Sequence, residues 1–107
     1  MKYHNQNILN SIGQTPLIKV QNIYAKLETT NPSGSIKDRI ALYMIRQAEK
    51  RGELKKGMTI LEITSGNTGV SFAMIAALLG YHFVAVMPKA IGLEKIKLIK
   101  LYYKKIK

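Results

Sequence analysis

Hydrophobic residues recur along the chain in two patterns, one typical of helices and one typical of strands. From residue 36 to residue 50 the apolar positions are three or four residues apart, which predicts a helix that begins at about Ile36 and ends before Gly52. The apolar stripe expected to face the core consists of Ile36, Ile40, Met44, Ile45 and Ala48. Three basic residues of this helix are expected to face water: Arg39, Arg46 and Lys50.

Shorter apolar runs predict strands. Leu17 to Val20 and Ile23 to Glu28 are separated by two residues, which predicts a β-hairpin. Thr59 to Ile63 and Tyr81 to Met87 flank a longer apolar block, Val70 to Leu79, which predicts a strand, a buried helix and a second strand. Such a succession forms a right-handed βαβ unit with parallel strands, and open sheets of this kind bind ligands at the carboxyl ends of the strands. The expected fold class is therefore α/β with an open parallel sheet.

The loop before the first predicted helix places one lysine in an unusual position. Pro32 and Gly34 break regular structure, and Ser35 with Asp38 has the spacing of a capping box, in which each side chain binds the other residue's backbone N–H. Lys37 then lies in the first turn, where the helix dipole disfavours an ammonium group. This position favours a lysine that is partly neutral and acts as a nucleophile or base, but an exposed first-turn lysine without a function costs only some tenths of a kcal/mol.

A second segment, Glu62 to Gly69, connects a predicted strand to the buried helix. Its sequence is Glu62-Ile63-Thr64-Ser65-Gly66-Asn67-Thr68-Gly69. The free N–H groups at the start of the helix form an anion site, to which the hydroxyl groups of Thr64, Ser65 and Thr68 add donors. The same residues also fit a helix that is merely capped by Asn67 or Thr68.

Together the two segments resemble the fold-type II family of pyridoxal 5'-phosphate (PLP) enzymes, and within it the cysteine synthase and cystathionine β-synthase branch. The resemblance covers about residues 8 to 100 and depends on four segments that occur in the family's order: Ile12 to Leu17, Lys26 to Arg39, Thr64 to Gly69 and Val86 to Pro88. Several motifs in the right order are harder to obtain by chance than any one of them. The resemblance implies a truncated form of the tryptophan synthase β-like fold, a three-layer open parallel sheet.

The resemblance also implies a cofactor, PLP, and a role for each motif. Lys37 would bond to the cofactor aldehyde and later remove the α-proton of an amino-acid substrate, and Asn67 would hydrogen-bond the ring hydroxyl. The substrate carboxylate would be held by Thr64, Ser65, Gly66 and Thr68. The implied reaction is β-replacement, in which O-acetylserine and sulfide give cysteine and acetate. A cystathionine β-synthase-like or a serine/threonine dehydratase-like reaction stays an alternative within the family.

The chain departs from this family in its length and in its last residues. The resemblance implies that the phosphate-binding loop and the group that meets the pyridine nitrogen come from a later domain, which is not in these 107 residues. We expect an N-terminal portion that is inactive alone, or that works as a homodimer or with a complementing C-terminal chain. Residues 1–34 would pack on the absent large domain, residues 35–102 would form a small α/β domain, and the lysine-rich residues 103–107 resemble an out-of-frame tail. The hairpin and the helix from Val70 are then expected to expose apolar surface.

Charge and composition add one alternative and several exclusions. Of the net charge of +11, residues 89–107 supply +6 through seven lysines and one glutamate. A non-catalytic basic fragment that binds a partner chain or nucleic acid is therefore an alternative, but no groove-reading motif accompanies the lysines, and a solvated tail is favoured. No apolar run reaches the ~18 residues needed to span a membrane, cysteine is absent, and residues 1–10 are polar, so a cytoplasmic protein without disulfides is expected. His4 and His82 lack metal-like partners, and no metal site is predicted.

Overall fold

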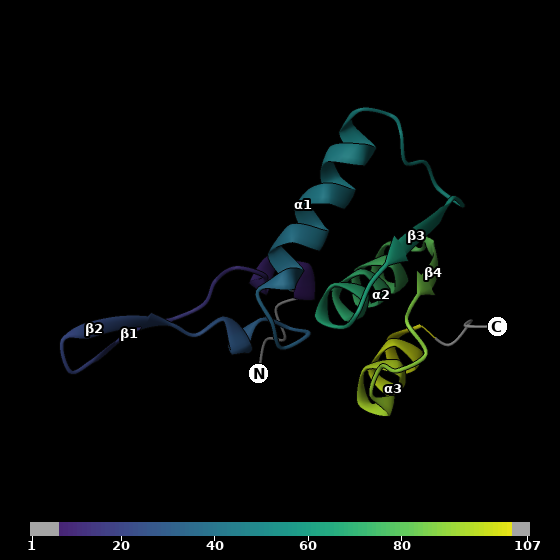
Figure 1. The fold of residues 1–107 in the computed structure, drawn as a ribbon. Helices are drawn as coiled ribbons and strands as arrows, with labels where there is room; N and C mark the ends of the chain where they lie inside the picture. Colours follow the sequence, from purple (N-terminus) through teal and green to yellow (C-terminus); the bar gives the residue numbers. More distant parts are fainter. Residues whose placement is uncertain (1–6, 104–107) are drawn as a thin grey trace, which may run out of the picture.

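The computed structural model describes residues 7–103 of the chain, where an α/β body carries an antiparallel hairpin that extends away from it (Figure 1). In chain order the elements are η1 (Ile8–Ser11), β1 (Leu17–Val20), β2 (Ile23–Lys26), η2 (Glu28–Thr30), α1 (Lys37–Lys50), β3 (Thr59–Ile63), α2 (Asn67–Leu79), β4 (His82–Val86) and α3 (Leu93–Tyr102). The predicted α/β class is confirmed, and the body consists of the elements from α1 onward.

The predicted hairpin is present, with β1 and β2 antiparallel and in register from Leu17 opposite Lys26 to Val20 opposite Ile23. Its two-residue turn places Gln21 in the left-handed region, with φ 54°. Strand β2 ends at Lys26, two residues before the predicted end, because Glu28 already begins the short 3-10 helix η2. The hairpin therefore leads directly into the loop that precedes α1.

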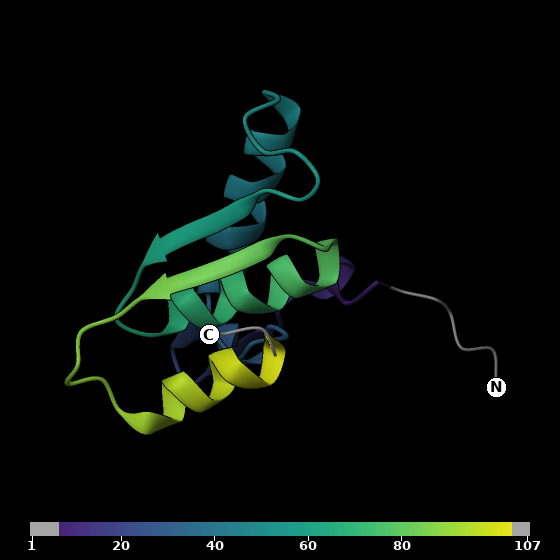
Figure 2. The same ribbon diagram turned by 90° about the vertical axis from the view of Figure 1, so that its right-hand side faces the viewer.

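The predicted βαβ unit is also confirmed. Strands β3 and β4 are parallel, in register from Thr59 opposite His82 to Ile63 opposite Val86, and α2 connects them. Helix α2 ends at Leu79 and is capped by Gly80, whose φ of 78° lets its N–H bind the carbonyl of Ala76. Helix α2 lies between the two strands and α3 (Figure 2).

The core forms around α2 because every residue from Gly69 to Ala76 is buried. The ring of Phe72 stacks on that of Phe83 at a centroid distance of 6.5 Å, and Tyr103 meets Phe83 edge-on at 6.2 Å. The prediction that this helix would expose apolar surface is wrong for most of its length, because β3, β4, α1 and α3 all pack against it. Tyr103 packs with the body, and the other tail residues, 104–107, lie outside the described residues.

The opposite face of the two-stranded sheet is open. Four apolar side chains on this face are exposed: Leu61, Ile63, Val84 and Val86. Among the described residues no helix covers them, so this chain by itself shows helices on one face of the sheet (Figure 2). No described helix is both long and apolar enough to cross a bilayer.

Helix α1 begins and ends where predicted, but its buried face is a different one. The residues that α1 buries are Asp38, Ala41 and Ile45. Ile36, Ile40 and Met44, predicted to face the core, are 48%, 45% and 49% exposed. The reason is that α2 is the main packing partner of α1 among the described helices and strands, so only a narrow stripe is covered. The expected stripe is therefore correct only at Ile45 and, in part, at Ala48.

Arg39, predicted to face water, instead anchors the N-terminal segment to α1. Its guanidinium donates two hydrogen bonds of 2.9 Å to the carboxylate of Glu28 and one of 2.8 Å to the carbonyl of Gly13. The Arg39 hydrogen bond is the main reason that the pKa of Glu28 falls from 4.5 to about 2. A local helical pattern could not reveal this contact, because the partners lie 11 and 26 residues away.

Candidate functional site

The N-terminal ends of α1 and α2 lie side by side, joined through the carboxylate of Asp38. This fully buried carboxylate accepts a hydrogen bond of 2.6 Å from the hydroxyl of Ser71, in α2, and one of 2.8 Å from the backbone N–H of Ser33. The hydroxyl of Ser33 donates to it as well. These bonds hold the loop before α1 against the start of α2. They place the backbone of Lys37 and the residue 64–69 loop at adjoining helix ends (Figure 1).

The predicted capping box at Ser35 and Asp38 is only half present. The hydroxyl of Ser35 accepts from the backbone N–H of Lys37 at 3.2 Å, which satisfies one free donor of the first turn. Asp38 does not reach back to Ser35, because three donors from Ser33 and Ser71 already surround its buried carboxylate. Buried polar groups are stable only when they are hydrogen-bonded, so this arrangement fixes Asp38 and with it the position of Lys37.

Thr64 shapes the loop before α2. Its hydroxyl oxygen accepts from the N–H groups of Gly66, at 3.2 Å, and Gly69, at 2.9 Å, and the residue is 6% exposed. The N-cap residue of α2 is Gly66, which has no side chain, and the hydroxyl of Thr64 instead satisfies the first-turn N–H of Gly69. The alternative that Asn67 or Thr68 is the N-cap is wrong, because the helix already begins at Asn67. A Cβ at Gly69 would lie 2.4 Å from Cγ2 of Thr64, so this close approach requires glycine.

Three backbone donors of the loop stay free. Within residues 7–103 the N–H groups of Ser65, Asn67 and Thr68 have no hydrogen-bond partner. They stand at the positive end of the α2 dipole, and the side chains of Ser65 and Asn67 are exposed. Free N–H groups and hydroxyls at a helix start suit an anionic group such as a carboxylate.

The predicted site residues are thus close in the fold, although they have different degrees of exposure. Lys37 is half-buried at the start of α1, and Asn67 is exposed at the start of α2. A primary amine for an aldehyde and several donors for anionic oxygens form a donor set that fits pyridoxal phosphate and an amino-acid carboxylate. The roles of the individual residues stay predictions.

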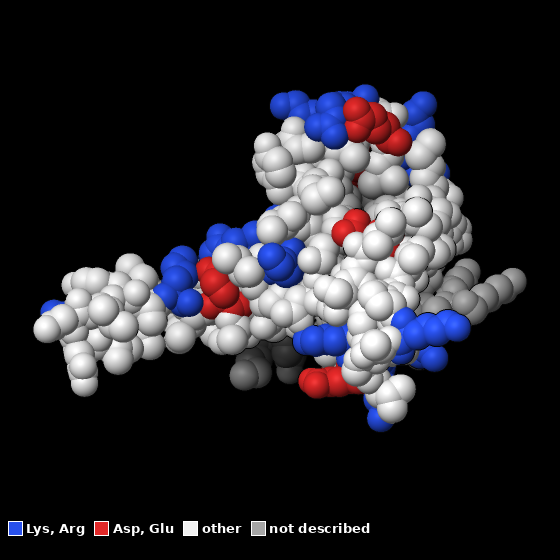
Figure 3. All heavy atoms as spheres, viewed as in Figure 1, with Lys and Arg blue, Asp and Glu red and all other residues white. Residues whose placement is uncertain are grey.

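One residue of this region was missed by the sequence analysis. The ammonium group of Lys95, on α3, donates a hydrogen bond of 2.6 Å to Oδ1 of Asn67. From the sequence, all lysines after residue 88 are expected to belong to one solvated group. Figure 3 shows basic side chains around α3, and no pattern in the sequence separates Lys95 from its neighbours Lys97 and Lys100, which are exposed.

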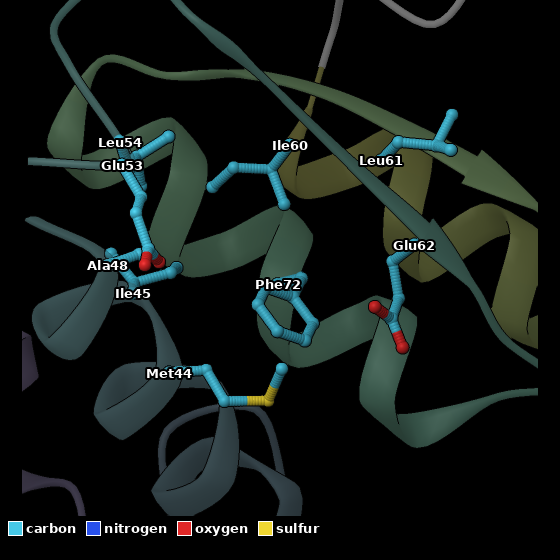
Figure 4. Close-up of a pocket in the computed structure, with 9 residues that line it drawn as sticks. All are labelled: Met44, Ile45, Ala48, Glu53, Leu54, Ile60, Leu61, Glu62 and Phe72. Carbon is cyan, nitrogen blue, oxygen red and sulfur yellow. The ribbon is translucent and has the colours of Figure 1, made fainter. Parts of the chain in front are cut away.

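A pocket of about 240 Å³ lies elsewhere, between α1, α2 and β3 (Figure 4). Its walls are mostly apolar and include Met44, Ile60 and Phe72, with the carboxylate of Glu62 at one side. Neither Lys37 nor any residue from Thr64 to Thr68 lines it. The candidate site is therefore an exposed junction of helix ends in this chain and not its apolar pocket.

Comparison with protein families gives a match that spans most of the chain. The family described as pyridoxal-phosphate dependent enzyme matches residues 8–107. A cysteine synthase from Flavobacterium sp. is 49% identical over 104 residues, which cover 91% of this chain and 34% of the relative. A cystathionine beta-synthase from Apis mellifera is 54% identical over 100 residues, which cover 84% of this chain and 20% of the relative.

Among solved structures, the crystal structure of an O-ureido-L-serine synthase superposes with a TM-score of 0.85 at 48% sequence identity. The match covers 89% of this chain and 32% of that one. The chain thus spans about a third, or less, of the length of the relatives that it matches. At this identity and TM-score the two chains share their fold over the matched residues.

Proposed function

Since this chain belongs to the family of pyridoxal-phosphate dependent enzymes, we propose that it is the cofactor-lysine and substrate-loop portion of a cysteine synthase-like enzyme. The proposed reaction is β-replacement, with O-acetylserine and sulfide as substrates and cysteine and acetate as products. The observation that supports it best is the junction of α1 and α2, where Asp38 and Ser71 hold the Lys37 helix end beside the donor-rich loop.

Two residues would hold the cofactor. The amine of Lys37 would bind its aldehyde covalently, and the carboxamide of Asn67 would donate to its ring oxygen. When bound, pyridoxal phosphate supplies an electron sink for the substrate's α-carbon. The amine of Lys37, released from the aldehyde, would then act as the base that takes the α-proton.

The substrate carboxylate would bind to the loop from Thr64 to Thr68. Ser65 and Thr68 offer hydroxyl donors next to free backbone N–H groups, and Gly66 adds no side chain of its own to the loop. Thr64 is different, because its oxygen already accepts two hydrogen bonds within the loop. Thr64 could still donate its hydroxyl hydrogen to the substrate carboxylate. It would also maintain the shape of the loop.

The whole enzyme would complete what this chain leaves open. We expect the three-layer sheet of the family, in which further residues cover the open face of β3 and β4 and supply the phosphate-binding loop. These residues would belong to a longer chain, to a complementing C-terminal chain or to a homodimer partner, and the location would be the cytoplasm. The relatives' greater length supports this proposal, since the chain covers 34% of the Flavobacterium cysteine synthase.

A cystathionine β-synthase-like reaction is the second candidate. The 54% identity to the Apis mellifera enzyme favours it, because that identity is higher than the one to the Flavobacterium cysteine synthase. Both candidates use the same lysine and the same loop, so they differ in the second substrate. Binding of sulfide or of homocysteine by the completed enzyme would separate them.

Covalent trapping tests the proposal on the chain itself. The protein is mixed with less than one equivalent of pyridoxal phosphate, reduced with borohydride, digested and analysed by mass spectrometry. We expect the label to concentrate on Lys37 and to be lost in Lys37→Ala, whereas Lys50→Ala, at the exposed far end of α1, should label like the wild type. Labelling spread evenly over the lysines would overturn the proposal.

A further inference from the structure

The hydrogen bond from Lys95 to Asn67 joins two elements at the candidate site. Lys95 lies in the first turn of α3, and its ammonium nitrogen is 2.6 Å from Oδ1 of Asn67, the first residue of α2. The stem of Lys95 follows the loop closely, since a Cβ at Gly66 would lie 3.9 Å from its Cε and 4.0 Å from its Cγ. The lysine is half-buried there, so its side chain rests on the loop.

The chemistry of the two groups determines the orientation of the amide. An ammonium group has three donors and no acceptor, whereas a carboxamide has one accepting oxygen and one donating NH₂ group. Only the oxygen of Asn67 can therefore face Lys95. The NH₂ group must point away from α3, and within the described residues it has no partner.

We propose that Lys95 is a positioning residue that fixes the Asn67 carboxamide with its NH₂ group toward the bound cofactor. This inference rests on the proposed function, in which Asn67 meets the ring oxygen of pyridoxal phosphate. That oxygen carries negative charge when it is ionised, so it accepts from an NH₂ group and is repelled by a carbonyl oxygen. The cation at Oδ1 also polarises the amide and strengthens the hydrogen bond that its N–H donates.

Loss of Lys95 has a predictable consequence for binding. With no donor at Oδ1, the exposed amide of Asn67 would take both orientations, and the correct one would fall to about half of the population. The apparent affinity follows that fraction, which gives about a twofold loss from orientation alone. Loss of polarisation adds to this, and we expect pyridoxal phosphate to bind about two- to tenfold more weakly.

The first experiment examines the free chain by NMR. Three variants are compared with the wild type: Lys95→Met, Lys95→Arg and Lys97→Met. The side-chain NH₂ signals of Asn67 should shift and exchange faster with water in Lys95→Met, and stay close to wild type in Lys95→Arg, which keeps a donor of similar reach. Lys97→Met removes an exposed charge from the same helix and should leave them unchanged. Unchanged Asn67 signals in Lys95→Met would overturn the inference.

The second experiment titrates the same variants with pyridoxal phosphate and follows absorbance. Lys95→Met should bind more weakly by the stated factor, and Lys95→Arg should recover most of the loss. Asn67→Asp should lose more than tenfold, because a carboxylate keeps the contact with Lys95 but cannot donate to the ring oxygen. Equal affinity of the wild type and Lys95→Met for pyridoxal phosphate would overturn the inference about Lys95 but leave the proposed function standing. A wild type that shows no selective attachment at Lys37 would overturn the proposed function and, with it, this role of Lys95.

Discussion

The β1–β2 hairpin and helix α2 are both rich in apolar residues, but they differ in what covers them. In α2 every residue from Gly69 to Ala76 is buried by neighbouring elements of the same chain. The hairpin instead exposes its large apolar side chains: Leu17, Ile18, Val20, Ile23 and Tyr24. In Figure 3 its outer end presents mostly uncharged atoms to solvent. Apolar side chains stabilise a segment only where another element removes them from water.

The two regions are also held in place by different forces. Packing of aromatic and aliphatic side chains holds α2, as at Phe72 and Phe83. The segment that carries the hairpin is tied to α1 by the hydrogen bonds of Arg39 to Glu28 and Gly13. Ion pairs of partly exposed groups depend on pH and salt, whereas buried apolar packing hardly does. Stability of the fold should therefore depend on α2, and order in the hairpin should depend on the Arg39 contacts.

The largest expected effect is a difference in folding stability between alanine variants of two isoleucines, one in α2 and one in the hairpin. Ile75 is 0% exposed in α2 and Ile23 is 66% exposed in the hairpin. Ile75→Ala should lower the free energy of unfolding by about 2 to 5 kcal/mol, since it removes buried methyl groups and leaves a cavity. Ile23→Ala should change it by no more than about 0.5 kcal/mol. Urea unfolding followed by circular dichroism measures both values. A similar loss in the two variants would show that something covers the hairpin in solution.

A smaller effect is expected where α2 meets its capping loop. In Gly69→Ala the new methyl group would approach Cγ2 of Thr64 to 2.4 Å and Cδ1 of Ile99 to 3.2 Å. Such overpacking outweighs the helical advantage of alanine, and we expect a net loss of about 1 to 2 kcal/mol in the same urea measurement. In the comparison variant Gly92→Ala the new Cβ would meet nothing within 4 Å, so its only expected cost is that of alanine at the N-cap of α3 and it includes no overpacking. Equal stability of Gly69→Ala and the wild type would mean that Thr64 moves freely, contrary to its hydrogen bond with the N–H of Gly69.

The helices and strands of both regions could be predicted from the sequence, but the residues that pack against them could not. Alternation, turn residues and a long apolar block are local signals, and they located β1, β2, β3, β4 and α2 to within a few residues. Which face of α1 is covered depends on the position of α2, so Ile40 and Met44 were placed in the core incorrectly. The partners of Arg39 and Lys95 are distant in sequence, and spacing carries no information on them. The Lys37 and Asn67 roles came from a family resemblance and stay predictions.

A third prediction concerns pH and the attachment of the hairpin. The pKa of Glu28 is about 2 in the folded chain against 4.5 ordinarily, mainly through its hydrogen bond with Arg39. A lowered folded-state pKa means that the contribution of this contact is complete above about pH 4.5 and is lost as the pH falls toward 2. The protection factors of the β1 and β2 backbone amides, measured by deuterium exchange and corrected for the intrinsic pH dependence of exchange, should therefore fall as the solution is acidified through this range, before those of α2 do.

Two substitutions show whether Glu28 is the group responsible for this pH dependence. Glu28→Gln should make the hairpin amides exchange fast at neutral pH already and remove the acid dependence, because a neutral amide cannot replace the ion pair. Glu53→Gln breaks an exposed ion pair with Arg51, just beyond the C-terminal end of α1, and should leave the hairpin as it is. High protection factors of the hairpin amides at every pH in Glu28→Gln would show that packing, and not the Arg39 contacts, holds this region.

The smallest effect on folding, with a clear effect on association, is expected at the hairpin surface. Ile23 and Tyr24 are 66% and 67% exposed beside other apolar residues of β1 and β2. Replacing both by threonine keeps a high strand propensity while it removes apolar surface, so the free energy of unfolding should change by no more than about 0.5 kcal/mol. Exposed apolar patches of this kind promote association, and light scattering should show a lower average mass for the double variant than for the wild type at equal concentration. A wild type that is already a well-behaved monomer would contradict this expectation, because the uncovered hairpin would then carry no tendency to associate.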